Sequence, residues 1–218
     1  MKPAVLVQAE IIAIGTIRLH GDLGLPREAK GVVLFAHGSG SGRLSPRNRF
    51  VAQTLQKRGL ATLLLDLLEE QEADDRRKVF DIDLLADRLL GATAWLRQQP
   101  ATKDLPVGYF GASTGAGAAL QAAARMPKAV AAVVSRGGRP DLAAPWLARV
   151  AAPTLLIVGG DDGPVIEMNQ DALAQLTCQK KLIIVPGATH LFEEPGTLEQ
   201  VADHAGAWFE RYLTKAGI

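Results

Sequence analysis

The sequence has a single cysteine, few aromatic residues and no long uninterrupted hydrophobic run. Cys178 has no second cysteine to pair with, so an intrachain disulfide is excluded and a reducing, cytoplasmic location is expected. Outside Ala/Gly-rich helical sequence, no apolar stretch reaches the roughly 18 residues that a membrane span needs. Near the N-terminus, Gln8 and Glu10 interrupt the apolar residues and no cleavage site follows, so we expect no signal peptide.

An excess of charge of one sign is also lacking. The 24 Lys and Arg residues against 23 Asp and Glu residues give a formal net charge of +1. This balance provides no electrostatic attraction for a nucleic acid or an anionic membrane, so we expect neither as a partner. The 218 residues are 48% hydrophobic, which suffices for one sizeable core, and no linker-like stretch divides them. We therefore expect a single domain over residues 1–218.

Predicted strands and helices alternate along the chain after an N-terminal hairpin over residues 5–26. The first of the later strands, residues 31–36, is a continuous apolar run, as expected of a strand buried on both faces, and residues 61–65 form the next buried strand. The later strands span residues 31–36, 61–65, 107–110, 129–134, 154–158 and 181–185. The helices span residues 47–57, 80–97, 142–148, 165–176 and 198–212, with an Ala-rich helix after residue 113. This alternation predicts an α/β fold: a mostly parallel sheet, helices on both faces and an antiparallel hairpin before it.

In such a sheet the functional site lies at the carboxyl ends of the strands, so chemistry is expected in the loops that follow them. The charged run 69–78 follows the strand 61–65. We interpret this run as a solvated connection, and a segment that gates the site is the alternative.

Residues 107–125 hold the most informative motif. A short strand meets Gly111-Ala112-Ser113-Thr114-Gly115, and the Ala-rich helix follows at once. Strand, G-x-S-x-G and helix in this order are typical of a nucleophile elbow, a tight turn that needs small residues around its serine. Ser113 is therefore the predicted nucleophile. The Thr114 N–H, at the start of the helix, is predicted to stabilise an oxyanion.

The glycines of this motif, together with Gly117, also fit the phosphate loop of some dinucleotide-binding reductases. That loop normally follows the first strand of its domain, and the reductases carry a Tyr-x-x-x-Lys pair. Here the residues four positions after Tyr109 and Tyr212 are Ser113 and Ala216. No acidic residue stands about 20 positions on to bind a ribose. The dinucleotide interpretation is therefore disfavoured.

A serine nucleophile needs a base, and the base needs an orienting acid. Among the four histidines, His190 alone follows a late strand in a glycine-containing loop, and we predict that it is the base. His37 ends an early strand, where a histidine commonly props the loop. We interpret His20 as a surface residue of the hairpin and His204 as part of a helix face.

The acid should follow an earlier strand, and Asp161 and Asp162 both come directly after residues 154–158. We predict that Asp162 orients His190, although either aspartate could serve. A turn or helix N-cap role is the alternative, because Asp before Gly-Pro suits a turn. The chain order Ser113, Asp162, His190 is the one expected of an α/β hydrolase.

Two further residues complete the predicted site. The Ser39 N–H, in the glycine-rich loop after residues 31–36, is the predicted second oxyanion donor, with Gly40 the next choice and an ordinary flexible turn the alternative. Arg136 follows the strand 129–134 and could hold a substrate carboxylate in a bidentate pair. A structural ion pair, for example with Asp141, is the alternative.

With these motifs, the chain resembles the α/β-hydrolase superfamily and, within it, the small dienelactone-hydrolase-like group. The resemblance covers nearly the whole chain and rests on residues 37–40, 111–115, 159–162 and 188–190; residues 45–48 and 135–141 resemble a bacterial subgroup. It implies acyl transfer to water through an acyl-enzyme without a cofactor, and we predict no metal site. True dienelactone hydrolases have cysteine at the elbow, where this chain has Ser113, and we interpret Cys178 as a packing residue. A general carboxylesterase therefore fits better than a dienelactone hydrolase.

The short connection between strands 129–134 and 154–158 leaves little room for a lid, so we expect an open site. Small or soluble esters, including lactones, are then the expected substrates, and a homodimer is left open. The alternative function is a non-hydrolytic binding protein or pseudo-enzyme on the same fold.

Overall fold

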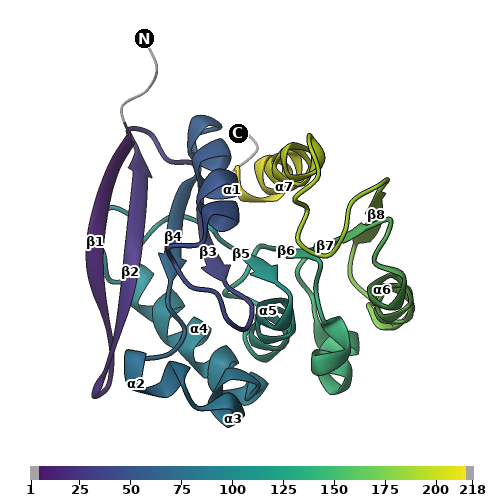
Figure 1. Cartoon of the computed structure of the whole chain (residues 1–218). Helices are drawn as coiled ribbons and strands as arrows, with labels where there is room; N and C mark the ends of the chain where they lie inside the picture. Colours follow the sequence, from purple (N-terminus) through teal and green to yellow (C-terminus); the bar gives the residue numbers. More distant parts are fainter. Residues whose placement is uncertain (1–4, 215–218) are drawn as a thin grey trace.

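The computed structural model describes residues 5–214, and one eight-stranded sheet runs through them (Figure 1). The strand order is β1-β2-β4-β3-β5-β6-β7-β8. The pair β1–β2 and the pair β2–β4 are antiparallel, and every other neighbouring pair is parallel. The strands are β1 (Val5–Ile14), β2 (Ile17–Pro26), β3 (Val32–Ala36), β4 (Ala61–Leu65), β5 (Val107–Ala112), β6 (Ala132–Arg136), β7 (Thr154–Gly159) and β8 (Lys180–Val185). The predicted mostly parallel sheet with an N-terminal hairpin is confirmed.

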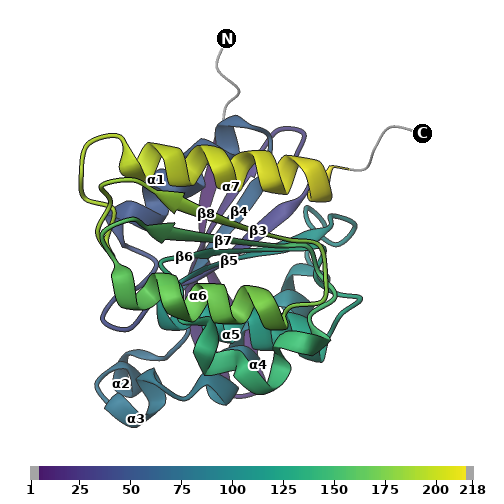
Figure 2. The same cartoon turned by 90° about the vertical axis from the view of Figure 1, so that its right-hand side faces the viewer.

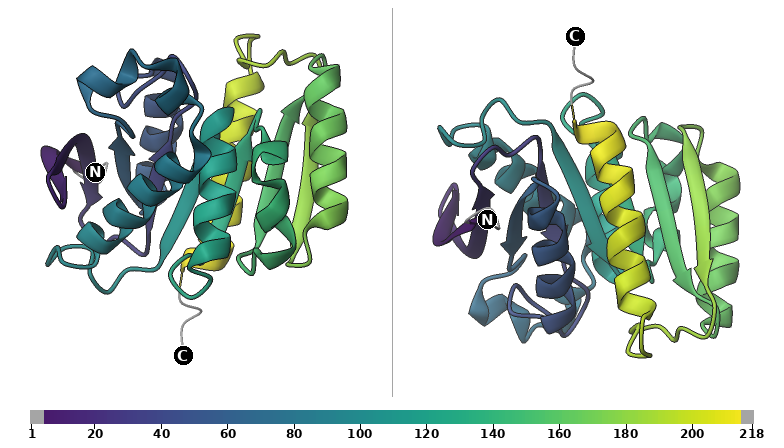
Figure 3. Two further views of the ribbon diagram at one scale, coloured as in Figure 1. Left: turned by 90° about the horizontal axis from the view of Figure 1, so that it is seen from below. Right: turned by 90° about the horizontal axis from the view of Figure 1, so that it is seen from above.

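Helices cover both faces of this sheet, α1 and α7 on one face and α4, α5 and α6 on the other (Figure 2). Seen from below, α4 and α5 lie in front of the strands, and seen from above, α1 and α7 do (Figure 3). The helices are α1 (Pro46–Lys57), α2 (Glu70–Ala73), α3 (Arg76–Val79), α4 (Ile82–Leu96), α5 (Thr114–Arg125), the 3₁₀ helix η1 (Pro140–Arg149), α6 (Gly163–Gln175) and α7 (Thr197–Leu213).

The parallel strands β3 to β7 are apolar because both of their faces are covered, whereas the edge strand β8 begins with two lysines and is largely exposed or half-buried. Every residue of β3, β4, β5 and β7 is buried. Two hydrophobic clusters form, one between the sheet and α4 and α5, the other between the sheet and α1 and α7. Such continuous burial gives the strands their runs of Val, Leu, Ile and Ala. Because β3 to β8 pair in parallel, their carboxyl ends lie on one common edge of the sheet.

Three segments differ from the sequence-based expectation. β6 covers Ala132–Arg136 rather than residues 129–134, because its parallel pairing with β5 extends to Arg136. The helix expected at 142–148 is the 3₁₀ helix η1, in which Pro145 lacks the N–H that an α-helix would use. The run 69–78 forms α2 and α3 and buries Glu72, so its interpretation as a solvated connection was wrong for that residue.

Only η1 joins β6 to β7 in the described chain, and no lid is inserted there, as predicted. None of the helices within residues 5–214 combines the length and the apolar character that crossing a membrane requires.

Candidate active site

Ser113 lies in the turn between β5 and α5 with φ 50° and ψ −123°. A serine at positive φ is strained by about 1–3 kcal/mol, so the surrounding structure must enforce the turn. The flanking glycines allow the close approaches that do so. A Cβ on Gly111 would lie 2.4 Å from Ala116 Cα, and a Cβ on Gly115 would lie 2.3 Å from Ala36 O. The turn therefore has the backbone geometry expected of a nucleophile elbow.

The end of β6 contacts both the elbow and the loop of His190. The Ser113 N–H donates to Arg136 O at 3.3 Å, and Ser113 O accepts from Arg139 N–H at 3.0 Å. On the other side, a Cβ on Gly137 would lie 3.1 Å from His190 O and 3.6 Å from His190 Cε1. Residues 136–139 thus bring two distant parts of the chain to the same place.

His190 and Asp162 are in direct contact. His190 Nδ1 lies 2.7 Å from Asp162 Oδ2, and the two side chains are 37% and 14% exposed. Since the carboxylate can only accept, this contact assigns the Nδ1 proton and leaves Nε2 free to act as a base. Asp162 occupies the N-cap position of α6 without a capping hydrogen bond. Asp161 is exposed, so the carboxylate that meets the imidazole belongs to Asp162.

The loop that carries His190 is braced by a residue that sequence analysis missed. Thr189 donates to Glu194 from its N–H at 3.1 Å and from its hydroxyl at 2.6 Å. These hydrogen bonds, the hydroxyl's above all, lower the pKa of Glu194. Phe192, buried at φ 55°, closes the same turn. An acidic residue five positions after a threonine was the only sequence signal, and it is too common to be informative.

The two predicted oxyanion donors lie side by side. Thr114 begins α5, and N–H groups in the first turn of a helix have no partner inside that helix. The Ser39 N–H donates to Thr114 Oγ1 at 2.9 Å. Gly38 lies against the elbow, since a Cβ there would be 2.9 Å from Ser113 Cβ. The loop after β3 therefore reaches Ser113, although the Ser39 N–H is engaged by the Thr114 hydroxyl.

His37 props this loop, as predicted from its position. Its Nδ1–H donates to Gly38 O at 3.0 Å, and its Nε2 accepts from the Leu67 N–H at 3.0 Å. Burial lowers the pKa of His37, against the smaller opposing effects of the Gly38 carbonyl and the Asp66 charge. His37 is therefore a neutral crosslink between the loops that follow β3 and β4.

Arg136 is buried beside this site. Its Nη2 lies 3.4 Å from Asn48 Oδ1, and its guanidinium carbon lies 5.8 Å from the centre of the Phe192 ring. Burial, with a smaller effect of a neighbouring arginine, lowers the pKa of Arg136 to about 10, so the group is still charged at neutral pH. Asp141 pairs with Arg139 at 2.8 and 2.7 Å, so the suggested ion pair between Arg136 and Asp141 was wrong.

A cavity of about 510 Å³ lies next to the elbow, on the side of β3 and β4. Gly38, Ser39 and Thr114 form its boundary with the elbow, and α2, α3 and α4 contribute its far wall. His20, interpreted as a surface residue, is exposed but lines this cavity. Sequence analysis missed the cavity because its walls come from segments far apart in the chain.

The described residues show no metal site near this turn, and Cys178 lies far from Ser113. Within residues 5–214, no group of three or more His, Cys, Asp or Glu side chains could hold a metal ion. Cys178 Sγ lies 3.8 Å from the hydroxyl of Thr154, the first residue of β7. It is therefore at the amino edge of the parallel strands, opposite to Ser113.

Comparisons with known proteins agree with this arrangement. Residues 19–213 match the model of the dienelactone hydrolase family. A crystal structure described as dienelactone hydrolase from Anabaena variabilis is 58% identical, with a TM-score of 0.92 over 98% of this chain and 100% of that chain. A structure from Xanthomonas campestris, described as a serine hydrolase without lid, is 20% identical, with a TM-score of 0.78 over 97% of each chain, and shows the same fold.

A curated protein of Mycobacterium tuberculosis named "Putative phosphoribosyl transferase" is 58% identical over 210 residues. The match covers 96% of this chain and 47% of that protein, so the chain spans about half the length of this curated relative.

Proposed function

Since the chain belongs to the dienelactone hydrolase family, we propose that it is a serine hydrolase that cleaves small or soluble carboxylic esters through an acyl-enzyme on Ser113. The observation that carries this proposal is the combination of two features at one edge of the sheet. One is the strained Ser113 turn, and the other is the 2.7 Å contact between His190 and Asp162. A hydrolase is what the fold and the family support; the ester class and the serine chemistry are our inference.

In the first step, Ser113 Oγ attacks the ester carbonyl carbon and its proton passes to His190 Nε2. The carbonyl oxygen becomes an oxyanion, which the Thr114 N–H and the Ser39 N–H stabilise. For Ser39 to take part, its hydrogen bond to Thr114 Oγ1 must be exchanged for one to the oxyanion. The carbon–oxygen bond to the alcohol then breaks, and the leaving oxygen takes the proton from His190.

In the second step, a water molecule attacks the acyl carbon and gives a proton to His190 Nε2. The bond to Ser113 Oγ breaks, Oγ takes that proton back, and the carboxylic acid leaves. Asp162 stabilises the imidazolium that forms in both steps without itself taking up a proton. The cycle consumes one water and needs no cofactor.

The substrate range follows from the nucleophile and from the open site. The family's dienelactone chemistry is associated with a cysteine at the elbow, whereas this chain has Ser113. No lid covers the carboxyl edge of the sheet in the described residues. Without a large apolar cover, long-chain lipids gain little burial. Small or soluble esters, with lactones among them, are therefore the proposed substrates.

The transferase activity in the name of the longer relative is not proposed for this chain, because the chain corresponds to only about half of that protein. The competing proposal is a non-hydrolytic binding protein on this fold. It is favoured only by the Ser39 N–H, which is engaged by Thr114 rather than free.

A labelling experiment separates the two proposals. A fluorophosphonate probe should modify the parent protein at Ser113, and Ser113→Ala should abolish both labelling and hydrolysis of p-nitrophenyl acetate. Cys178→Ser, at the opposite edge of the sheet, is the matched control and should retain both. A parent protein that is folded but neither labelled nor active would refute the hydrolase.

A further inference from the structure

The cavity beside the elbow is connected to the reaction centre through Gly38. Gly38 lines the cavity, and a Cβ on it would lie 3.7 Å from Ser113 Oγ. Ser39 and Thr114, whose N–H groups are the proposed oxyanion donors, line the cavity as well. A group attached to the reacting carbonyl carbon can therefore extend directly into this space. Its volume of about 510 Å³ lies within the range of small-molecule sites, roughly 300–1,000 Å³.

The sheet order determines which half of an ester can lie there. His190 and Asp162 follow β8 and β7, on one side of Ser113. The cavity is bounded by the loops after β3 and β4, on the other side. Since His190 must protonate the leaving oxygen, the alcohol leaves on the β6–β8 side. The acyl group then points away from His190, toward the cavity.

The charges of the lining select the kind of acyl group. Arg43 is the only Lys or Arg among the lining residues, and its Nη1 lies 2.6 Å from Asp66 Oδ2. Asp22 Oδ1 also lies 3.5 Å from Arg43 Nε. With Arg43 already countered, the exposed carboxylate of Glu70 gives the lining a net negative charge, and the half-buried, neutral His37 adds nothing to offset it. An anionic acyl group would be repelled.

The far wall of the cavity is apolar. Leu68 and Leu85 are 8% and 3% exposed, and Val79 and Ala73 complete this side. An uncharged organic group in contact with this wall would bury apolar surface, which is favourable by about 25 cal/mol per Å².

We propose that this cavity is the acyl pocket and that it accepts an uncharged acyl group, with room for one as large as a benzoyl group. The proposal rests on the proposed ester hydrolysis, because it assigns one half of that substrate to one cavity. It predicts a preference for neutral over anionic acyl groups, which differs from what an arginine clamp for a substrate carboxylate would give.

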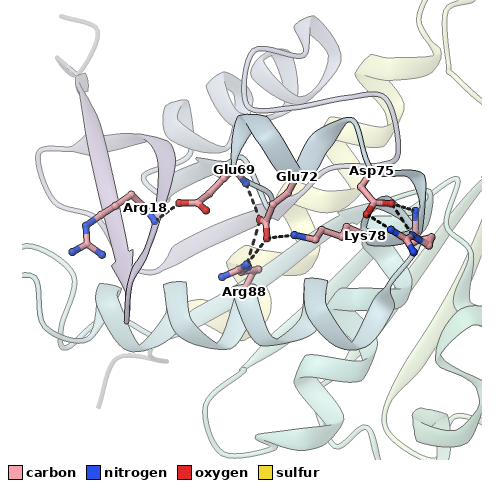
Figure 4. A network of polar contacts seen from close by, with 7 residues as sticks. Arg18, Glu69, Glu72, Asp75, Lys78 and Arg88 are labelled. Atoms are coloured by element: carbon pink, nitrogen blue, oxygen red, sulfur yellow. Dashed lines mark hydrogen bonds and ion pairs between the residues drawn. The ribbon is translucent and has the colours of Figure 1, made fainter.

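The wall is held in place by a network centred on Glu72 (Figure 4). Arg88 Nη2, from α4, donates to both Glu72 oxygens at 3.1 and 3.2 Å, and Lys78 Nζ, from α3, donates to Oε1 at 3.0 Å. The Glu69 N–H donates to Oε2 at 3.1 Å, and Glu69 in turn accepts from the Arg18 N–H of β2 at 2.9 Å. Three elements, β2, α3 and α4, thus hold α2 at the cavity wall, so the pocket is preformed.

Filling the pocket tests the assignment. Ala73 lines the cavity and is an exposed residue outside the hydrophobic core, so Ala73→Trp can place an indole in the cavity without disturbing the core. Gln71→Trp, on the same helix but outside the lining, is the matched control. Two ester sets are compared: p-nitrophenyl acetate against p-nitrophenyl benzoate, which differ in the acyl group, and phenyl acetate against 1-naphthyl acetate, which differ in the alcohol.

The expected result is that Ala73→Trp lowers kcat/KM for the benzoate about 10-fold or more relative to the acetate and leaves the phenyl-to-naphthyl ratio unchanged. Gln71→Trp should change neither ratio. The deacylation rate constant of the benzoyl-enzyme should fall in the same variant, because the alcohol has already left at that stage. Unchanged ratios, or a loss confined to 1-naphthyl acetate, would overturn the acyl assignment.

Reversing the charge tests the selectivity. The parent should hydrolyse p-nitrophenyl benzoate in preference to the anionic mono-p-nitrophenyl succinate, and Glu70→Lys should raise the relative kcat/KM of the succinate by about 3-fold or more. A parent that prefers the succinate overturns the proposal. If the parent hydrolyses phenyl acetate but neither substitution has its effect, the acyl pocket alone fails. If no ester is hydrolysed and the fluorophosphonate does not label Ser113, the ester hydrolase itself fails.

Discussion

Asp162 occupies the N-cap position of α6, but its carboxylate accepts a hydrogen bond from His190 Nδ1 at 2.7 Å and caps no helix N–H. An aspartate that caps a helix typically contributes about 1 kcal/mol to stability. Here that contribution is absent, and the carboxylate instead fixes the orientation and tautomer of an imidazole in a loop 28 residues away in sequence.

Asp162→Asn is therefore expected to reduce kcat by about 10⁴-fold, because an amide stabilises the wrong tautomer of His190. Its thermal stability should change little, because no cap is lost. Asp161→Asn is the matched control and should keep nearly full activity. Steady-state kinetics of both variants decide the matter, and a larger loss in Asp161→Asn would move the acid to that residue.

Ser113→Ala is expected to lower kcat by about 10⁴-fold or more without unfolding the protein. Alanine keeps the strain of the positive φ, whereas glycine relieves it. Ser113→Gly should therefore be the more stable of the two inactive variants by about 1 kcal/mol in chemical denaturation. Equal stabilities would mean that the elbow stores no backbone strain, and retained esterase activity in either variant would exclude Ser113 as the nucleophile.

Thr114→Val tests the oxyanion site, since it removes the acceptor of the Ser39 N–H but keeps the shape of the side chain. The Ser39 N–H is then free for the oxyanion, so kcat/KM should be maintained or raised. Stability should fall by about 1 kcal/mol, because a hydrogen bond of the free protein is lost. A loss of about 100-fold in kcat would show instead that the Thr114 hydroxyl is itself a required donor.

Glu72→Gln is expected to destabilise the protein by about 1–3 kcal/mol, because Arg88 loses its buried counter-charge. Asp74→Asn, an exposed change in the same segment, is the control. Burial alone would raise the pKa of Glu72, but hydrogen bonds from Lys78 and from the Glu69 N–H, and the charge of Arg88, lower it below its ordinary value of 4.5.

A carboxyl whose pKa is lowered by folding stabilises the native state at neutral pH, and the benefit is lost as the pH falls below the ordinary value toward the lowered one. The stability difference between the parent and Glu72→Gln should therefore shrink below about pH 4.5. Urea denaturation at pH 7 and at lower pH measures it. A difference that is constant with pH would contradict an ionised Glu72.

Arg136→Leu is expected to lower stability and to reduce the turnover of neutral and anionic esters equally. The guanidinium is buried between Asn48 and Phe192, so its loss loosens the turn that carries His190. Thermal unfolding and kcat/KM on a neutral and an anionic ester are the measurements. A selective loss on the anionic ester at unchanged stability would restore Arg136 as a carboxylate ligand.

The parts of the fold and site that could be predicted from the sequence are those set by short segments. Continuous apolar runs placed the parallel strands, and small residues around Ser113 placed the elbow. The choice between Asp161 and Asp162 could not be decided in this way, because both follow β7 and only the path of the loop after β8 selects one. Local spacing gives no information on such a contact.

Sequence analysis did not predict the side-chain contacts between residues on different elements. Glu72 and Arg88 lie 16 residues apart on different helices, and each alone looks like an ordinary surface charge in the sequence. Asp141 was suggested as an alternative ion-pair partner of Arg136, but β6 continues through Arg136, and Arg139 reaches the aspartate instead. Strand bounds that differ by two residues are enough to exchange such partners.

The sheet order has a consequence for how relatives of this chain can diverge. The proposed base and its acid come from the part of the chain after β6, whereas the cavity walls come almost entirely from residues before β5. Mutations that reshape the cavity therefore accumulate in a stretch of sequence that leaves Asp162 and His190 untouched. Under selection for a new substrate, the N-terminal half can drift rapidly while the proposed base and acid are inherited intact, and recombination between relatives at the start of β5 would exchange specificity as a single block.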